Sequence, residues 1–200
     1  MGAPSATTDF DASAGKVTSP AGLAHIVLRT ANFASMVDFY TKFLGGTITY
    51  GNDFLSFITY DEEHHRIAII SVPGTAPKQP TSSGLEHVSF SFTTMHNLLL
   101  AYRQRKQKGI EPVWSVNHGP TTSIYYKDPD RNMIETQVDN FASVEEATAF
   151  MNSEHFVENP IGTDVDPEDL IARLQNGESD KSLMKRVEIG ARAVPDLVAM

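Results

Sequence analysis

The sequence predicts an α+β fold, in which two βαβββ modules form a curved mixed sheet around a metal cavity and a helical tail follows. A pattern of one strand, one helix and three strands occurs twice, and a histidine stands early in each copy, at His25 and His87. The tail is indicated by a change beyond residue 140, where helix-capping residues replace the strand pattern. Because a repeated half-domain brings equivalent positions together, the two histidines indicate a shared metal site.

The first module is assigned to residues 22–72. Its first strand, residues 23–28, places His25 on the face opposite three apolar side chains, because side chains alternate along a strand. A helix over residues 33–44 is indicated by apolar residues at the helical period, and Gly45 follows its end. Three further strands are expected at residues 47–50, 54–60 and 65–72.

The second module is assigned to residues 84–140, after a linker over residues 73–83 that is rich in Pro, Gly, Ser and Thr. It repeats the order, with a strand over 85–92 that carries His87 on its more polar face and a helix over 94–108. The other strands are expected near residues 111–115, 122–127 and 132–138. A turn is expected between the last two strands, at Asp128-Pro129-Asp130-Arg131-Asn132.

The two ends of the chain differ from the modules. Residues 1–21 are small and polar, and we expect a disordered leader there. Residues 141–200 are expected to form a C-terminal extension of two or three helices. Ser143 and Glu146 form a capping box, and Asp166-Pro167-Glu168 supplies an N-cap, a first-turn proline and an acid. We expect this extension to cover a sheet edge or a partner subunit.

The composition excludes several classes of function. The chain has no cysteine, which excludes disulfides, zinc–thiolate sites and cysteine nucleophiles and fits a reducing cytoplasm. A formal net charge of −9 argues against nucleic acid as a partner, because binding to a phosphate backbone relies on clustered Lys and Arg. No apolar stretch approaches the ~20 residues that span a bilayer, so no membrane partner is expected.

Glu135 is the third candidate metal ligand, on the last strand of the second module. A carboxylate on an apolar strand needs a partner, because burying it alone is costly. With His25 and His87 it completes a set of two histidines and one carboxylate, which leaves three positions of an octahedral ion open and suits Fe(II). Mn(II) accepts the same ligands. A single strand histidine is more often a hydrogen-bonded core residue, but equivalent positions in two copies favour the metal site.

Three ordered motifs link the chain to a known family. They are the set His25, His87 and Glu135, the stretch Phe39-Tyr40-x-x-Phe43-Leu44-Gly45, and Asp128-Pro129-Asp130-x-Asn132-x-Ile134-Glu135. By these motifs residues 22–140 resemble the vicinal oxygen chelate superfamily. That superfamily includes glyoxalase I, bleomycin and fosfomycin resistance proteins, methylmalonyl-CoA epimerase and the type I extradiol dioxygenases. The chain is most similar to a single-module type I extradiol dioxygenase.

The resemblance implies an Fe(II)-dependent extradiol dioxygenase, which cleaves the ring of a small catecholic aromatic diol with O2. The stretch His64-His65-Arg66-Ile67-Ala68 matches a His-His pair of that group. By this match His65 is the implied acid/base catalyst, since an imidazole exchanges protons near neutrality. Tyr125 matches a tyrosine that hydrogen-bonds the bound substrate oxygen, and His118 stands near the group's polar site residues. A homodimer is also implied, because dimers are common in the superfamily.

Two other functions stay open from the sequence. One is an isomerase or lyase of the glyoxalase type, but those members generally take a fourth ligand from the last strand of the first module. This chain has Arg66-Ile67-Ala68-Ile69-Ile70 there, without a carboxylate or glutamine. The other is a binding protein that holds an aromatic ligand without converting it, as bleomycin resistance proteins do. Those proteins usually lack the two histidines and the glutamate.

Overall fold

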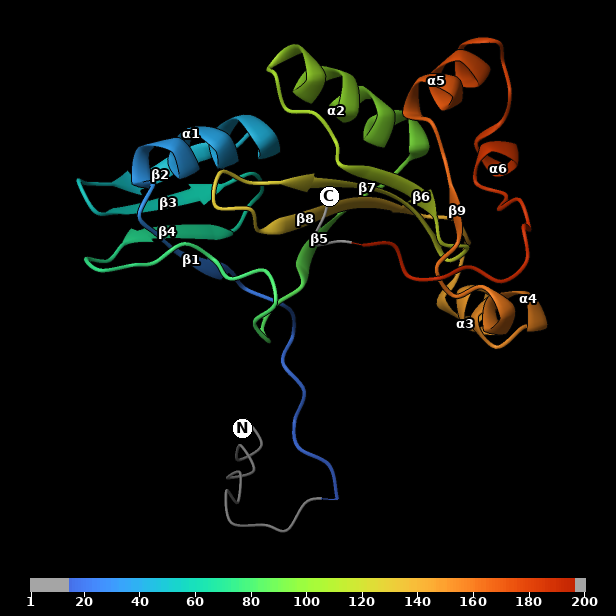
Figure 1. The fold of residues 1–200 in the computed structure, drawn as a ribbon, viewed down its shortest axis with the longest axis horizontal. Coiled ribbons are helices and arrows are strands. Elements are labelled where there is room, and N and C mark those ends of the chain that lie inside the picture. The colour runs from blue at the N-terminus through green and yellow to red at the C-terminus, as the bar shows by residue number, and fades with distance from the viewer. Residues whose placement is uncertain (1–14, 197–200) are drawn as a thin grey trace, which may run out of the picture.

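The computed structural model describes residues 15–196 and has the expected α+β architecture (Figure 1). Residues 1–14 of the expected leader lie outside the described residues, and residues 15–21 form neither helix nor strand. None of the described helices is long and apolar enough to cross a membrane.

The first module is a four-stranded sheet with one helix packed on it. Its elements are β1 (Ile26–Thr30), α1 (Phe33–Leu44), β2 (Thr47–Gly51), β3 (Leu55–Thr59) and β4 (Ile67–Ser71). The sheet order is β1-β4-β3-β2, with β1 parallel to β4 and the other pairs antiparallel. The parallel ladder begins where Ile26 pairs with Ile67. His25 was expected within the first strand, but it lies just before β1.

The second module repeats this arrangement. Its elements are β5 (His87–Phe92), α2 (Met95–Gln107), β6 (Trp114–Asn117), β7 (Thr121–Lys127) and β8 (Met133–Asp139). The sheet order is β5-β8-β7-β6-β9, where β9 (Thr163–Asp164) comes from the C-terminal extension. The prediction of two βαβββ modules is confirmed. Their strands form two sheets, because no hydrogen-bonded ladder joins β1 to β5 within the described part of the chain.

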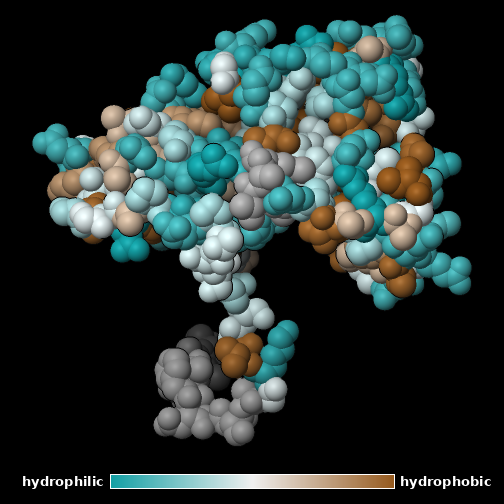
Figure 2. Space-filling view, in the orientation of Figure 1, coloured by the Kyte–Doolittle hydropathy of each residue, from teal (hydrophilic) through white to brown (hydrophobic). Residues whose placement is uncertain are grey.

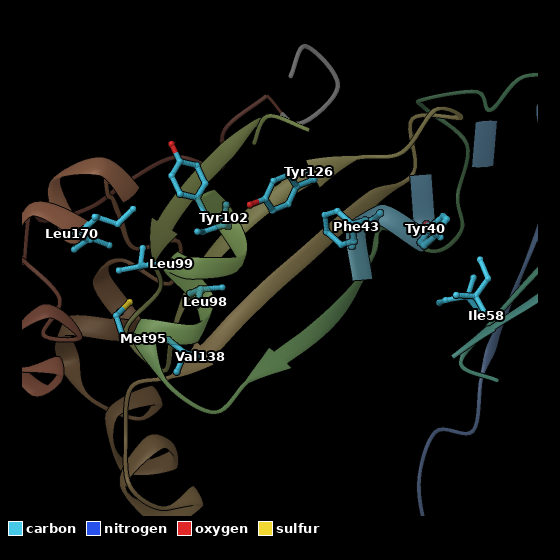
Figure 3. Packing of buried hydrophobic residues seen from close by; sticks show 14 of the residues in the cluster. Tyr40, Phe43, Ile58, Met95, Leu98, Leu99, Tyr102, Tyr126, Val138 and Leu170 are labelled. Atoms are coloured by element: carbon cyan, nitrogen blue, oxygen red, sulfur yellow. The ribbon is translucent and has the colours of Figure 1, made fainter. Parts of the chain in front are cut away.

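One hydrophobic core joins the two modules. Helices α1 and α2 lie on the same side of the molecule, each over its own sheet (Figure 1). Figure 3 shows Phe43 of α1 facing Tyr126 of β7, and their ring centroids are 5.0 Å apart. Arg105 of α2 is buried and donates from Nε to the carbonyl oxygen of Phe43 at 2.9 Å. The helices thus occupy one side of the sheets, and the opposite side carries the candidate site.

The C-terminal extension consists of short elements at the outer edge of the second sheet. Its helices are α3 (Val144–Met151), α4 (Glu154–Glu158), α5 (Pro167–Gln175) and α6 (Asp180–Leu183). The strand β9 pairs with β6 and covers that sheet edge, as expected. Four helices occur in the described residues where two or three were expected, because α4 and α6 have only five and four residues and show no periodic pattern.

The outer surface agrees with this packing. Over α2 and α5, at the top of the molecule, the surface is mostly hydrophilic (Figure 2). Tyr102 and Lys106 of α2 both donate to Glu168 of α5, each at 2.9 Å. These polar contacts hold the extension against the second module from the side opposite to the candidate site.

Candidate metal centre

Several candidate residues are cross-strand neighbours on the second sheet. Glu135 of β8 lies between Ser89 of β5 and Tyr125 of β7. Because directly paired residues point to the same face of a sheet, these side chains share one face. The adjacent row on that face consists of His87, Met133 and Lys127.

His87 and Glu135 form the central pair of this face. The Nε2 atom of His87 lies 3.1 Å from Oε2 of Glu135, and the Glu135 side chain is only 6% exposed. Two ligand atoms bound at right angles to one cation at about 2.1 Å are about 3.0 Å apart, so this geometry fits two ligands of a single ion. The chemistry of the two donors, an imidazole nitrogen and a carboxylate oxygen, fits as well.

The electrostatics of the pair favour an ionised carboxylate. Burial raises the pKa of Glu135, but hydrogen bonds from His87, Ser123 and Ser89 outweigh it and lower the pKa to about 2. The hydrogen bond to Glu135 raises the pKa of His87. Glu135 therefore carries a full negative charge at neutral pH, which a buried position tolerates only with a cationic or hydrogen-bonding partner.

Tyr125 and His118 lie together beside the pair. The Nε2 atom of His118 is 3.0 Å from the hydroxyl oxygen of Tyr125, and its Nδ1 atom is 2.5 Å from the carbonyl oxygen of Ile161. A carbonyl only accepts, so Nδ1 carries the proton and Nε2 of the neutral ring accepts from Tyr125. Burial lowers the pKa of His118, which favours this neutral form. Trp114 stacks on Tyr125 with centroids 4.9 Å apart.

His65 is buried next to His25 on the first module. Its ring stacks on Phe57 with centroids 4.4 Å apart, and it lies equally close to the ring of His25. Burial lowers the pKa of His65, so the imidazole is neutral at physiological pH. Its Nδ1 atom is buried and has no hydrogen-bond partner among the described side chains and backbone. The neighbouring His64 is exposed and pairs with Glu63 at 2.9 Å.

His25 is separate from the central pair but adjacent to it. It lines a cavity of about 190 Å³ together with Ser89. Ser89 is in turn the ladder partner of Glu135. Within residues 15–196, no three His, Cys, Asp or Glu side chains lie close enough together to hold one metal ion. The structure thus brings together two of the three expected ligands, and the complete set stays a prediction.

Two participants in the site are absent from the sequence-based prediction. Trp114, the only tryptophan, could be found from its place on the strand paired with Tyr125. The carbonyl oxygen of Ile161 could not be found, because a backbone acceptor has no side-chain signature and reaches His118 only through the fold of the extension.

Comparison with known proteins agrees with the fold. The model of the Glyoxalase/Bleomycin resistance protein/Dioxygenase superfamily matches residues 22–136. Biphenyl-2,3-diol 1,2-dioxygenase 2 of Rhodococcus globerulus is 43% identical over 76% of this chain and 80% of its own length. Biphenyl-2,3-diol 1,2-dioxygenase 3 of the same organism is 42% identical over 82% of this chain and 87% of its own length.

A solved structure supports the same fold. A glyoxylase/bleomycin resistance protein/dioxygenase domain from Frankia sp. covers 60% of this chain and 99% of its own, with a TM-score of 0.51 and 20% identity. At that identity the likeness concerns the fold alone. The family match over more than half of the residues and the identity to both relatives show the family. The chain belongs to the glyoxalase/bleomycin resistance protein/dioxygenase superfamily, as its ordered motifs predict.

Proposed function

We propose that this protein is an extradiol dioxygenase, which uses O2 to open the ring of a catecholic substrate beside its two hydroxyl groups. The observation that carries this proposal is the identity of 43% and 42% to two biphenyl-2,3-diol 1,2-dioxygenases over most of both chains. The glyoxalase-type alternative is less well supported, because β4 offers no fourth ligand in Arg66-Ile67-Ala68-Ile69-Ile70.

The residues proposed to hold Fe(II) are His25, His87 and Glu135. When bound, such an ion supplies a Lewis-acidic and redox-active centre at which vicinal oxygens and O2 can meet. Support comes from the 3.1 Å separation of His87 and Glu135 and from the cavity that His25 shares with Ser89. Mn(II) accepts the same donors and is the second candidate.

The remaining site residues have distinct proposed roles. Tyr125 stays protonated, because burial and the charge of Glu135 raise its pKa, and on substrate binding its one hydroxyl proton turns from Nε2 of His118 to a substrate oxygen. His118 holds that hydroxyl in place before substrate binds. His65 accepts a proton from the substrate and returns it to the product, since its ring is neutral and its buried Nδ1 has no partner among the described residues. A buried nitrogen left in that state costs about 1–3 kcal/mol, which a hydrogen bond with substrate would offset.

Anaerobic purification with metal analysis, followed by O2 uptake on catechol and biphenyl-2,3-diol, tests this proposal. We expect bound iron and stoichiometric O2 consumption, and His87→Ala should lose the metal. His65→Phe should retain iron and lose most of its turnover. A full iron load in His87→Ala would contradict the ligand assignment, and normal turnover by His65→Phe would contradict the acid/base role.

A homodimer in the cytoplasm is part of the same proposal. The edge strand β2 is exposed along its whole length and carries Ile48 and Tyr50, which are 47% and 51% exposed. The equivalent edge of the second sheet is covered by β9. A second copy on β2 would cover the uncovered edge, which is otherwise open to unspecific pairing. Light scattering on the wild type and on Tyr50→Glu tests this, since the charge should give a monomer.

A further inference from the structure

Three cationic side chains converge on a cavity beside the candidate metal centre. Lys78 of the linker, Lys127 of β7 and Arg131 of the β7–β8 turn line a cavity of about 340 Å³, together with Glu86 and Met133. Lys78 and Arg131 also line the neighbouring cavity that contains Arg29. Such a gathering is conspicuous in a chain whose formal net charge is −9.

The sheet register places this cavity next to the pair of His87 and Glu135. Met133 lines the cavity and is the ladder partner of His87 on one side and of Lys127 on the other. Neighbouring strands are about 4.8 Å apart, so Lys127 lies roughly 10 Å from His87 across the same face. That span is about the length of one aromatic ring with a short side chain.

The backbone at Arg131 adopts a left-handed conformation. Arg131 has φ of 66°, and it is the only non-glycine residue with positive φ in the described part of the chain. Asp128 holds this turn by accepting hydrogen bonds from the backbone of Asp130 and Asn132. Glycine or asparagine adopts this conformation at lower cost, so the position carries an arginine against the local backbone preference.

Two of the three cations, Lys78 and Arg131, are not held in ion pairs in the part of the chain that the structure describes. Lys78 and Arg131 form no ion pair with the described residues within 4.0 Å. Burial lowers the pKa of Lys127, the charges of Arg131 and Lys78 lower it further, and Glu86 opposes them. A bound anion would balance the charges of Lys78 and Arg131 and relieve their repulsion with Lys127.

We propose that this cavity binds a carboxylate on the substrate, so that the preferred substrates are catechols with an acidic substituent. The inference rests on the proposed dioxygenase function and adds the substrate class. Arg131 supplies a planar guanidinium fork suited to a carboxylate, and Lys78 and Lys127 supply point charges.

Substrate selectivity is the first test. The ratio of kcat/KM for 3,4-dihydroxyphenylacetate to that for neutral 4-methylcatechol is measured by O2 uptake. Arg131→Gln should lower this ratio roughly tenfold, mainly through KM, because it removes one charged hydrogen bond at a partly solvated position. Arg131→Lys should restore part of it. Lys108→Gln removes an equal charge at the end of α2, which does not line the cavity, and should leave the ratio unchanged.

Folding is controlled separately with Arg131→Gly. This variant removes the positive-φ strain, so it should melt at or above the wild-type temperature while it loses the same selectivity. An unchanged ratio in both Arg131→Gln and Arg131→Gly, with 4-methylcatechol still cleaved, would overturn the inference and leave the dioxygenase proposal intact.

Binding without turnover keeps the two proposals separate. Calorimetry with 4-hydroxyphenylacetate and with 4-methylphenol measures affinity even if the protein cleaves no catechol. The acid should bind more tightly to the wild type, and Arg131→Gln should remove that advantage. Inorganic phosphate is titrated alone. Phosphate binding without preference for the aromatic acid would mean a free-anion site and overturn the substrate assignment.

Discussion

At the residue scale, the hydrogen bond between Tyr125 and His118 links catalysis to stability. Tyr125→Phe removes the hydroxyl and leaves Nε2 of His118 without its partner at 3.0 Å. An unsatisfied, largely buried nitrogen should cost about 1–2 kcal/mol of unfolding free energy. We expect a lower urea midpoint at an unchanged m-value, together with reduced turnover.

The adjacent tyrosine provides the control for this change. The hydroxyl of Tyr126 is buried and makes no hydrogen bond of good geometry with the described residues. Tyr126→Phe removes the same atom one position along the chain and should change the midpoint much less. Equal losses in both variants would show that the Tyr125 hydroxyl contributes nothing through His118.

The candidate residues illustrate what a sequence can predict at this scale. Alternation along β5 and β8 predicts which face of each strand carries the side chains of His87 and Glu135. The parallel pairing of these strands then puts both side chains on one face of the sheet, 3.1 Å apart. The neighbourhood of His65 is different, because it depends on the packing of Phe57 and His25 around a loop end. Side-chain identity predicts the chemistry, whereas the partners of a loop residue depend on the finished fold.

At the scale of elements, Gly162 controls how the extension meets the β6–β7 turn. Its φ is 101°, and a Cβ there would collide with the carbonyl oxygen of Asn117 and with Cα of His118, 2.7 Å away. Gly162→Ala should therefore cost more than about 2 kcal/mol and displace His118, because backbone cannot move aside as a side chain can.

Gly177 is the matched position for that prediction. It also has positive φ, 87°, but a Cβ there meets nothing within 4 Å. Gly177→Ala should cost only the left-handed strain, about 1–2 kcal/mol, and leave turnover unchanged. Thermal melts and O2 uptake on both variants measure the difference. Equal activity losses would contradict the proposed contact between Gly162 and the site.

The contact between α2 and α5 should depend on pH. Hydrogen bonds from Lys106 and Tyr102 lower the pKa of Glu168 below its ordinary value of 4.5. A lowered carboxyl pKa means that the stabilisation is fully present above pH 4.5 and is lost as the pH falls through the lower folded value. Melting temperatures of wild type and Glu168→Gln should differ at pH 7 and converge on acidification. A constant difference would contradict the linkage.

Elements with strong periodicity are the ones that the sequence predicts well. The apolar stripe and the following glycine predict α1 with both ends correct, at Phe33–Leu44. The first strand of each module begins later than expected, because the ladders to β4 and β8 start at Ile26 and His87. The two-residue strand β9 has no periodic pattern at all, and only the exposed edge of β6 makes it a strand.

At the scale of the whole molecule, the repeat predicts two modules but not their degree of coupling. Tyr40 of α1 donates to Asp128 in the β7–β8 turn at 3.1 Å, and Asn32 donates to Asp130 at 2.6 Å. Burial and the charge of Asp128 raise the pKa of Tyr40, so it remains a donor. The same turn presents Arg131 to the proposed anion cavity. Module packing and the substrate pocket therefore share one structural element.

This coupling predicts that the two modules unfold as one unit. Trp114 is the only tryptophan and reports on the second module. A second protein with Trp114→Phe and Phe33→Trp moves the probe to α1, where residue 33 packs against the shared core. Because buried residues of both modules belong to that one core, urea transitions of the two proteins should each be single and should coincide with their far-UV circular dichroism. If the fluorescence of the tryptophan at position 33 changed at a lower urea concentration than the circular dichroism of the same protein, the first module would unfold alone. In that case the contacts of Tyr40 and Arg105 would be too weak to make the two repeats one cooperative domain.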